Sequence, residues 1–144
     1  MATAERDGVP ASLYLDTSAV LRAIVEEGSS PEVEARLRDA PVLVTSRLSE
    51  VEASRVLHRL RQTARVPEVK LANAEREIAE LWARCELWEL TPAVCEMARN
   101  VAPGRPLRAL DALHLATFVL ARQKLGDLEL LTVDDRLREA AGVV

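Results

Sequence analysis

The sequence predicts an α/β protein, a three-layer α/β/α sandwich in which helices cover both faces of a central parallel sheet. Short apolar segments alternate along the chain with longer segments that have the spacing of amphipathic helices. Strands that are apolar along their whole length are typical of a parallel sheet buried on both faces. At 144 residues, with neither an internal repeat nor a low-complexity tract, the chain has the size of one domain.

The first half of the chain predicts two strands and three helices. The segment from Gly28 to Pro31 ends the first helix, and Pro31 suits the first turn of the next one. Ser46 follows the second strand and is a favourable N-cap for a long helix. The predicted order is a strand at 12–15, a helix at 17–27, a helix at 31–40, a strand at 42–45 and a helix from 46 to about 61.

The second half continues the alternation. Pro67 begins an amphipathic helix, for which we expect an inserted or partner-facing position. Thr91 and Pro92 supply the cap and the first turn of a short helix, and Gly126 ends a later helix that is apolar on nearly all sides. The predicted order is a helix at 67–85, a strand at 87–90, a helix from 92, a loop at 103–106, a helix at 109–126, a strand at 128–133, a helix at 134–141 and a short edge strand at 143–144.

The ends of the chain and its cysteines indicate a cytoplasmic protein. We expect residues 1–10 to be a disordered terminus and residues 11–144 to form the domain. Cys85 and Cys95 fit neither a CxxC motif nor a disulfide framework, which indicates buried thiols in a reducing compartment. No apolar run approaches the length of a transmembrane span, and residues 1–10 lack the apolar region of a signal peptide.

Charge is distributed unevenly along the chain. The net charge of −4, from 19 basic and 23 acidic residues, does not by itself favour binding to a polyanion. The segments 53–67 and 97–110, however, contain several arginines and no acid. They form either solvated or partner-facing surfaces, or surfaces that contact phosphate groups. Aromatic residues make up only 3% of the chain, so few rings are available for the stacking of bases.

Four acids stand out by their position. Asp16 and Asp134 each follow a predicted strand, and the carboxyl ends of parallel strands lie along one edge of a sheet, where ligands bind. Asp111 and Glu52 lie within predicted helices. Each acid also has an ordinary structural explanation. Asp16 and Asp134 suit N-cap positions, Asp111 suits the first turn of a helix, and Glu52 can pair with Arg55 three residues later or with Arg59 one turn further on.

Carboxylates that are crowded into one crevice repel each other, and a divalent cation removes that repulsion. Ligation by oxygen alone favours Mg²⁺ or Mn²⁺ over zinc, and such a site can hydrolyse a phosphodiester with water that the metal activates. The sequence has no GxGxxG, GxxxxGK[ST], GxSxG or HExxH motif, which leaves the corresponding nucleotide-binding, esterase and zinc sites unsupported. His114 lies three residues after Asp111, and we expect it to be packed or hydrogen-bonded rather than a ligand.

The helix after Ser46 contains two glutamates, of which Glu52 is the functional candidate. Residues two apart on a helix point about 160° away from each other, so Glu50 and Glu52 cannot share a role. We expect Glu50 on the solvent face and Glu52 on the inward face. The predicted inward face consists of Leu48, Val51, Val56 and Leu60.

The whole chain resembles the PIN-domain family and, within it, the VapC-type toxins of bacterial and archaeal toxin–antitoxin pairs. Four motifs match in order: LDTSAVLRAIVEE, VTSRLSEVEASRVLHRL, LRALDALHLAT and LLTVDDRLREAAG. Each motif is short, but four in the same order make a specific match. The family's S-x-L-x-x-x-E pattern, placed on Ser46 and Leu48, also selects Glu52.

The resemblance implies a Mg²⁺- or Mn²⁺-dependent endoribonuclease with the PIN-like α/β/α sandwich. It implies a homodimer and a cognate VapB-type antitoxin whose C-terminal segment blocks the site. Arg55, Arg59 and Arg108 are then candidate contacts for RNA or for the antitoxin. The implied catalytic and metal-binding residues are Asp16, Glu52, Asp111 and Asp134, with a supporting hydroxyl from Thr17 or Ser18.

One departure and two alternatives remain at this point. The last motif reads TVDD where the family often has an aromatic residue before a single acid, and we choose Asp134 over Asp135 because it follows the strand directly. A catalytically silent PIN-like module that binds RNA or protein is the alternative function, and the intact set of acids argues against it. A metal-dependent phosphatase would want a DxD motif, which Asp16-Thr17-Ser18 does not supply.

Overall fold

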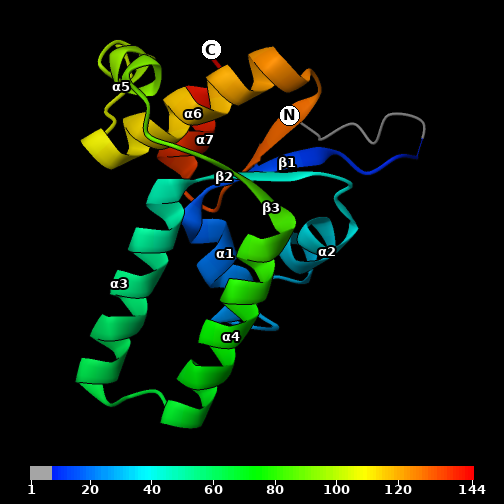
Figure 1. Cartoon of the computed structure of the whole chain (residues 1–144), viewed down its shortest axis with the longest axis vertical. Coiled ribbons are helices and arrows are strands. Elements are labelled where there is room, and N and C mark those ends of the chain that lie inside the picture. The colour runs from blue at the N-terminus through cyan, green and yellow to red at the C-terminus, as the bar shows by residue number, and fades with distance from the viewer. Residues whose placement is uncertain (1–7) are drawn as a thin grey trace.

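The computed structural model describes residues 8–144 and shows one α/β domain (Figure 1). The predicted disordered terminus at 1–10 falls largely on residues 1–7, which lie outside the described residues. Among residues 8–144, no helix combines the length and the apolar character that a bilayer-spanning segment needs.

Four parallel strands form the central sheet, in the order β3-β2-β1-β4. They are β1 (Ser12–Leu15), β2 (Leu43–Ser46), β3 (Cys85–Trp88) and β4 (Leu128–Leu131). The predicted parallel sheet is therefore confirmed. The third strand begins two residues before its predicted start, because Cys85 already has an extended backbone where the preceding helix ends. β1 lies between β2 and β4, so its carboxyl end has a neighbouring strand on both sides.

The first four helices of the chain cover one face of the sheet (Figure 1). They are α1 (Thr17–Ile24), α2 (Pro31–Asp39), α3 (Arg47–Thr63) and α4 (Glu68–Arg84). Leu13 and Leu15 of β1 pack into this layer, where the core consists of leucine, valine, isoleucine and alanine side chains. α3 and α4 run antiparallel, and Arg61 of α3 forms ion pairs with Glu68 and Glu75 of α4.

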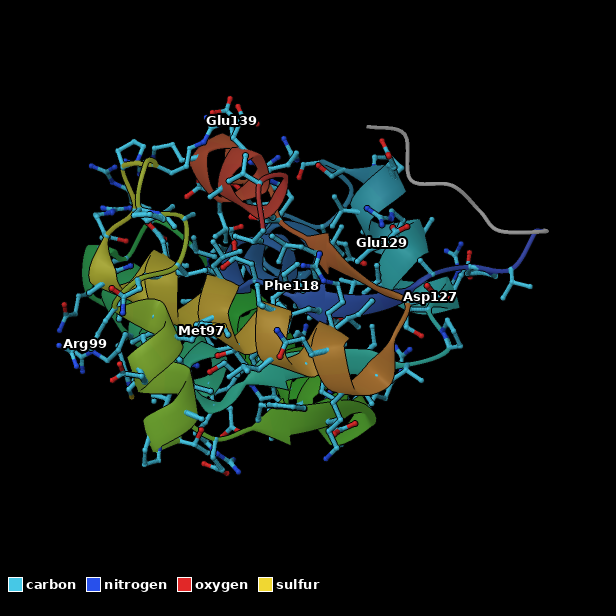
Figure 2. The ribbon with its side chains drawn as sticks, turned by 90° about the horizontal axis from the view of Figure 1, so that it is seen from above. Met97, Arg99, Phe118, Asp127, Glu129 and Glu139 are labelled. Carbon is cyan, nitrogen blue, oxygen red and sulfur yellow. The ribbon has the colours of Figure 1, made fainter. Side chains whose placement is uncertain are left out.

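The other face of the sheet is covered by α5 (Pro92–Ala98), α6 (Ala109–Leu125) and α7 (Asp135–Ala141). Tyr14, which alternates with Leu13 and Leu15 on β1, faces this layer. Figure 2 looks onto the layer, with Phe118 in its interior and Arg99 and Glu139 pointing outward. The three-layer α/β/α architecture is therefore confirmed.

Several local predictions are confirmed and two are wrong. The Ser46 hydroxyl accepts a hydrogen bond from the Leu48 N–H (3.1 Å), and the Thr91 hydroxyl accepts one from the Val94 N–H (3.2 Å), so both residues cap their helices as expected. The predicted edge strand at 143–144 does not form, because the chain turns there and the Val143 N–H donates to the last turn of α7. Cys95 is exposed rather than buried, since it lies on the outer side of α5.

The helix α4, for which we expected an inserted or partner-facing position, contributes one side to the core. Leu71, Ala74, Ile78 and Leu81 lie one helical turn apart along α4, and all four are buried against the layer that α1 and α3 form. The opposite side of α4 is exposed, as Val69 shows with 70% of its surface accessible. This side remains open to a partner.

We expect Leu71→Ala to lower the free energy of unfolding by about 2–5 kcal/mol, because it removes a fully buried side chain and leaves a cavity. Val69→Ala, two residues earlier on the same helix, should change it by less than about 0.5 kcal/mol. Urea unfolding followed by circular dichroism measures both values. Similar losses in the two variants would contradict the orientation of α4.

Candidate active site

Asp16 lies directly after the central strand β1 and is buried. Its backbone N–H donates to the Leu131 carbonyl of β4 (3.1 Å), which continues the pairing of β1 with β4. Its carboxylate does not cap α1. Instead, Oδ2 accepts hydrogen bonds from the hydroxyls of Ser18 and Thr132, the latter at 2.8 Å. The ordinary explanation of Asp16 as an N-cap therefore does not apply, and two hydroxyls fix the direction of the carboxylate.

Glu52 reaches the same edge of the sheet from α3. Its Oε1 accepts a hydrogen bond from the Thr17 hydroxyl (2.8 Å) and another from Nε2 of His114 (2.6 Å). The alternative ion pairs with Arg55 or Arg59 do not form. Glu50 is turned away from this edge and forms an ion pair with Arg47 (2.7 Å). The structure therefore separates the two glutamates as the helix geometry requires.

The predicted inward face of α3 is partly wrong. The buried line consists of Ser49, Ala53 and Leu57, whereas Val51 is 56% exposed. Glu52 lies on the flank of this line and keeps a quarter of its side chain exposed. The prediction followed the large apolar residues, and the small residues Ser49 and Ala53, which lie on the buried line with Leu57, were not counted as inward-facing.

His114 connects the acids and was not among the predicted site residues. It lies in the middle of the buried helix α6 and is 1% exposed. Its Nδ1 is 2.9 Å from the Tyr14 hydroxyl, and its Nε2 is 3.9 Å from Oδ1 of Asp16 as well as bonded to Glu52. The expectation that His114 is hydrogen-bonded is confirmed. Its only signal in the sequence is a polar ring on an otherwise apolar helix, one turn after Asp111.

Two pKa values reflect this arrangement. Burial raises the pKa of Glu52, but its interaction with His114 and the hydrogen bond from Thr17 outweigh burial and leave the pKa below its usual value. Burial, reinforced by the nearby negative charge of Asp16, raises the pKa of Tyr14 well above its usual value. Glu52 is therefore a carboxylate at neutral pH, and Tyr14 keeps its proton.

Asp111 lies in the first turn of α6, where its Oδ2 accepts a hydrogen bond from the Arg108 N–H (3.4 Å) and lies 3.6 Å from the Arg108 guanidinium. Asp111 therefore lies in the first turn of its helix, as the ordinary structural explanation of this acid requires. Its side chain is only 17% exposed, and it precedes His114 by one turn on the same side of α6.

Asp134 caps α7, since its Oδ1 accepts a hydrogen bond from the Arg136 N–H (2.9 Å). Its own backbone N–H donates to the Thr132 hydroxyl (3.0 Å), which in turn donates to Asp16, so Thr132 connects these two acids. Asp135 is 85% exposed and is paired with Arg138. This geometry favours Asp134 over Asp135 as the site residue.

The four acids share one feature that bears on metal binding. Within residues 8–144, each uses one carboxylate oxygen for its hydrogen bonds and leaves the other without one. The uncommitted oxygens are Oδ1 of Asp16, Oε2 of Glu52, Oδ1 of Asp111 and Oδ2 of Asp134. In the described part of the chain, no three such side chains already lie close enough together to share a metal ion. The donor chemistry nevertheless fits a hard divalent cation, because all the free donors are carboxylate oxygens.

Comparison with known protein families matches residues 13–143 to the PIN domain. This chain belongs to the PIN-domain family. Among curated relatives of this PIN domain, Ribonuclease VapC46 of Mycobacterium tuberculosis (strain ATCC 25618 / H37Rv) is 36% identical over 133 residues, which are 91% of each chain. Ribonuclease VapC35 of Mycobacterium tuberculosis (strain CDC 1551 / Oshkosh) is 36% identical over 131 residues, which are 90% of this chain and 89% of that protein.

Two solved structures share the fold of this PIN domain. PAE2754 from Pyrobaculum aerophilum has a TM-score of 0.60 and 23% identity, over 91% of this chain and 80% of that chain. VapBC2 from Rickettsia felis, bound to a DNA fragment from its promoter, has a TM-score of 0.54 and 11% identity, over 85% of this chain and 99% of that chain. At such low identity these likenesses concern the fold alone.

The lowered pKa of Glu52 leads to a prediction about stability and pH. Folding favours the charged form of this carboxylate, so its contribution to stability is complete above the ordinary pKa of 4.5 and is lost as the pH falls through the lower folded value. In buffers with chelator, the difference in unfolding free energy between wild type and Glu52→Gln should be constant above about pH 5 and shrink below it. Urea unfolding at a series of pH values measures this difference, and parallel curves down to pH 3 would contradict it.

Proposed function

We propose that this PIN domain is a Mg²⁺- or Mn²⁺-dependent endoribonuclease and the toxin of a toxin–antitoxin pair. The observation that carries this proposal is the pair Asp16 and Glu52, whose carboxylates face one edge of the sheet and are both oriented by hydroxyl donors. Relatives at 36% identity over almost the whole chain are named ribonucleases, which supports RNA as the substrate class.

Each residue of the site has a task in this proposal. Asp16, Glu52, Asp111 and Asp134 would hold the metal, and the metal when bound would supply Lewis-acid stabilisation and activate water. Ser18 and Thr132 keep Asp16 in one orientation, and Thr17 does the same for Glu52. These hydroxyls donate to one oxygen of each carboxylate, so the other oxygen would be available to the metal.

The arginine-rich segments contribute less free positive charge than the sequence indicated, because acids from elsewhere in the fold neutralise several of them. Arg61, Arg99 and Arg105 are paired with glutamates, and Arg108 is paired with Asp111. Arg55 and Arg59 are exposed, lie one turn apart on α3, and form no ion pair with residues 8–144. We therefore assign Arg55 and Arg59 to contacts with RNA phosphates, with Arg108 as a further candidate at the start of α6.

The proposal includes two protein partners. A VapB-type antitoxin would bind this chain and cover the acids, in line with the names of the VapC relatives. A second copy of this chain would form a homodimer. Val69 of α4 and Val51 of α3 are exposed apolar side chains that are available to either partner.

We expect Glu52→Gln to lower the rate of RNA cleavage with Mg²⁺ or Mn²⁺ at least tenfold, or about 1.4 kcal/mol of activation free energy. Glu50→Gln on the same helix should stay near the wild-type rate, because Glu50 is paired with Arg47 away from the acids. Chelation of the metal should abolish cleavage by the wild type. Cleavage at the wild-type rate by Glu52→Gln, or cleavage that chelator does not reduce, would reject the metal-dependent mechanism, whereas a wild type that cleaves no RNA would favour the silent binding module.

The second prediction concerns RNA binding by a catalytically inactive Asp16→Asn background. Each lost contact with single-stranded RNA lowers the dependence of log affinity on log salt by about 0.7, so Arg55→Ala/Arg59→Ala should reduce the slope by about 1.4. Arg99→Ala is the matched control, because Arg99 is exposed but already paired with Glu96. Filter binding between about 50 and 200 mM salt measures the slopes. An unchanged slope in the double variant would place the RNA elsewhere.

A further inference from the structure

We propose that His114 is a positioning residue of the site: it donates a hydrogen bond from Nε2 to Glu52, and so holds this carboxylate beside Asp16 with one oxygen free. The inference rests on the proposed function, in which Glu52 binds metal. It starts from the position of the ring. His114 is buried in α6, on the opposite face of the sheet from α3, and yet its Nε2 reaches Oε1 of Glu52 at 2.6 Å.

The direction of each hydrogen bond follows from the partners. Glu52 is a carboxylate and accepts only, so Nε2 must carry the proton that it donates. Tyr14 keeps its own proton, and its hydroxyl lies 2.9 Å from Nδ1. A neutral ring with the proton on Nε2 satisfies both contacts, because Tyr14 then donates to the lone pair on Nδ1. We assign this tautomer to His114, in which Tyr14 donates to Nδ1 while Nε2 donates to Glu52.

The same assignment excludes His114 as a metal ligand in this arrangement. A histidine binds metal through a ring nitrogen with a free lone pair. The lone pair on Nδ1 is occupied by Tyr14, and Nε2 carries a proton directed at Glu52. The ring is thus an orienting group for an acid, the kind of partner whose removal typically weakens metal binding 10- to 100-fold.

The position of His114 also bears on which oxygens of Glu52 and Asp16 accept hydrogen bonds at this edge of the sheet. Nε2 lies 3.9 Å from Oδ1 of Asp16, too far for a hydrogen bond, while the bond to Glu52 is short. Oδ1 of Asp16 and Oε2 of Glu52 therefore remain without a hydrogen bond within residues 8–144. The Thr17 hydroxyl gives Oε1 of Glu52 a second donor (2.8 Å), so that oxygen is saturated and the free one is defined.

The test measures the Mn²⁺ affinity of the full chain by titration calorimetry for His114→Asn and His114→Gln. The amide of glutamine reaches as far as Nε2 and keeps a donor for Glu52, whereas the amide of asparagine reaches only as far as Nδ1. We expect His114→Asn to bind Mn²⁺ about 10- to 100-fold more weakly and His114→Gln to stay within about threefold of wild type. His58→Asn is the control, because His58 is exposed on α3.

The proposal is overturned if folded His114→Asn binds Mn²⁺ with wild-type affinity. It is also overturned if His114→Asn and His114→Gln lose the same Mn²⁺ affinity, because a donor at the position of Nε2 would then make no difference. A second measurement does not depend on metal: ¹⁵N NMR of the wild type should show His114 protonated at Nε2 and not at Nδ1. An Nδ1-protonated ring overturns the proposal even if His114→Asn does not fold. A wild type that binds no Mn²⁺ but has the Nε2 tautomer overturns the metal-dependent function while leaving the role of His114 in orienting Glu52 supported.

Discussion

The carboxylates of Asp16 and Glu52 are largely removed from water, so each needs hydrogen-bond donors from the protein. The arrangement of the helices and strands around the site supplies these donors. Asp16 at the end of β1 takes its donors from α1 and from the end of β4, through Ser18 and Thr132. Glu52 takes its donors from both helical layers, through Thr17 of α1 and His114 of α6. The sheet order places β1 between β2 and β4, so the carboxyl ends of β1 and β4 lie side by side at one edge of the sheet. The acids are thus held by groups that only the complete three-layer fold brings together.

The fold was largely predictable because its signals are local. Short apolar strands, the caps at Ser46 and Thr91 and the glycine after α6 mark the elements within a few residues of each boundary. The errors fall where the local signal is ambiguous. Cys85 continues a helical pattern in the sequence but begins a strand, and Val143 and Val144 have strand-forming side chains but follow the last turn of a helix. In both places the packing of the neighbouring element decided the backbone.

The site was predictable only in part, for a different reason. Asp16 and Glu52 could be selected from strand ends and helix phase, which are local properties. The donors that distinguish these two acids from ordinary caps or ion pairs come from distant parts of the chain, 62 residues away for His114 and Glu52 and 116 for Thr132 and Asp16. Pattern analysis cannot supply such contacts. For the same reason it overstated the free positive charge, since the glutamates that pair with Arg61 lie on the next helix.

The pairing of β1 with β4 has a consequence for the order of events during synthesis. Residues 12–15 leave the ribosome early, and β2 can join them once α2 has been made, but the other edge of β1 waits for residues 128–131. Until Thr132 has been synthesised, the Asp16 carboxylate lacks one of its two hydroxyl donors. Until β4 has been added, α6, which carries His114, has no complete sheet to pack against. For a chain proposed to cleave RNA, this order leaves the site unfinished until residues 128–132 have been synthesised.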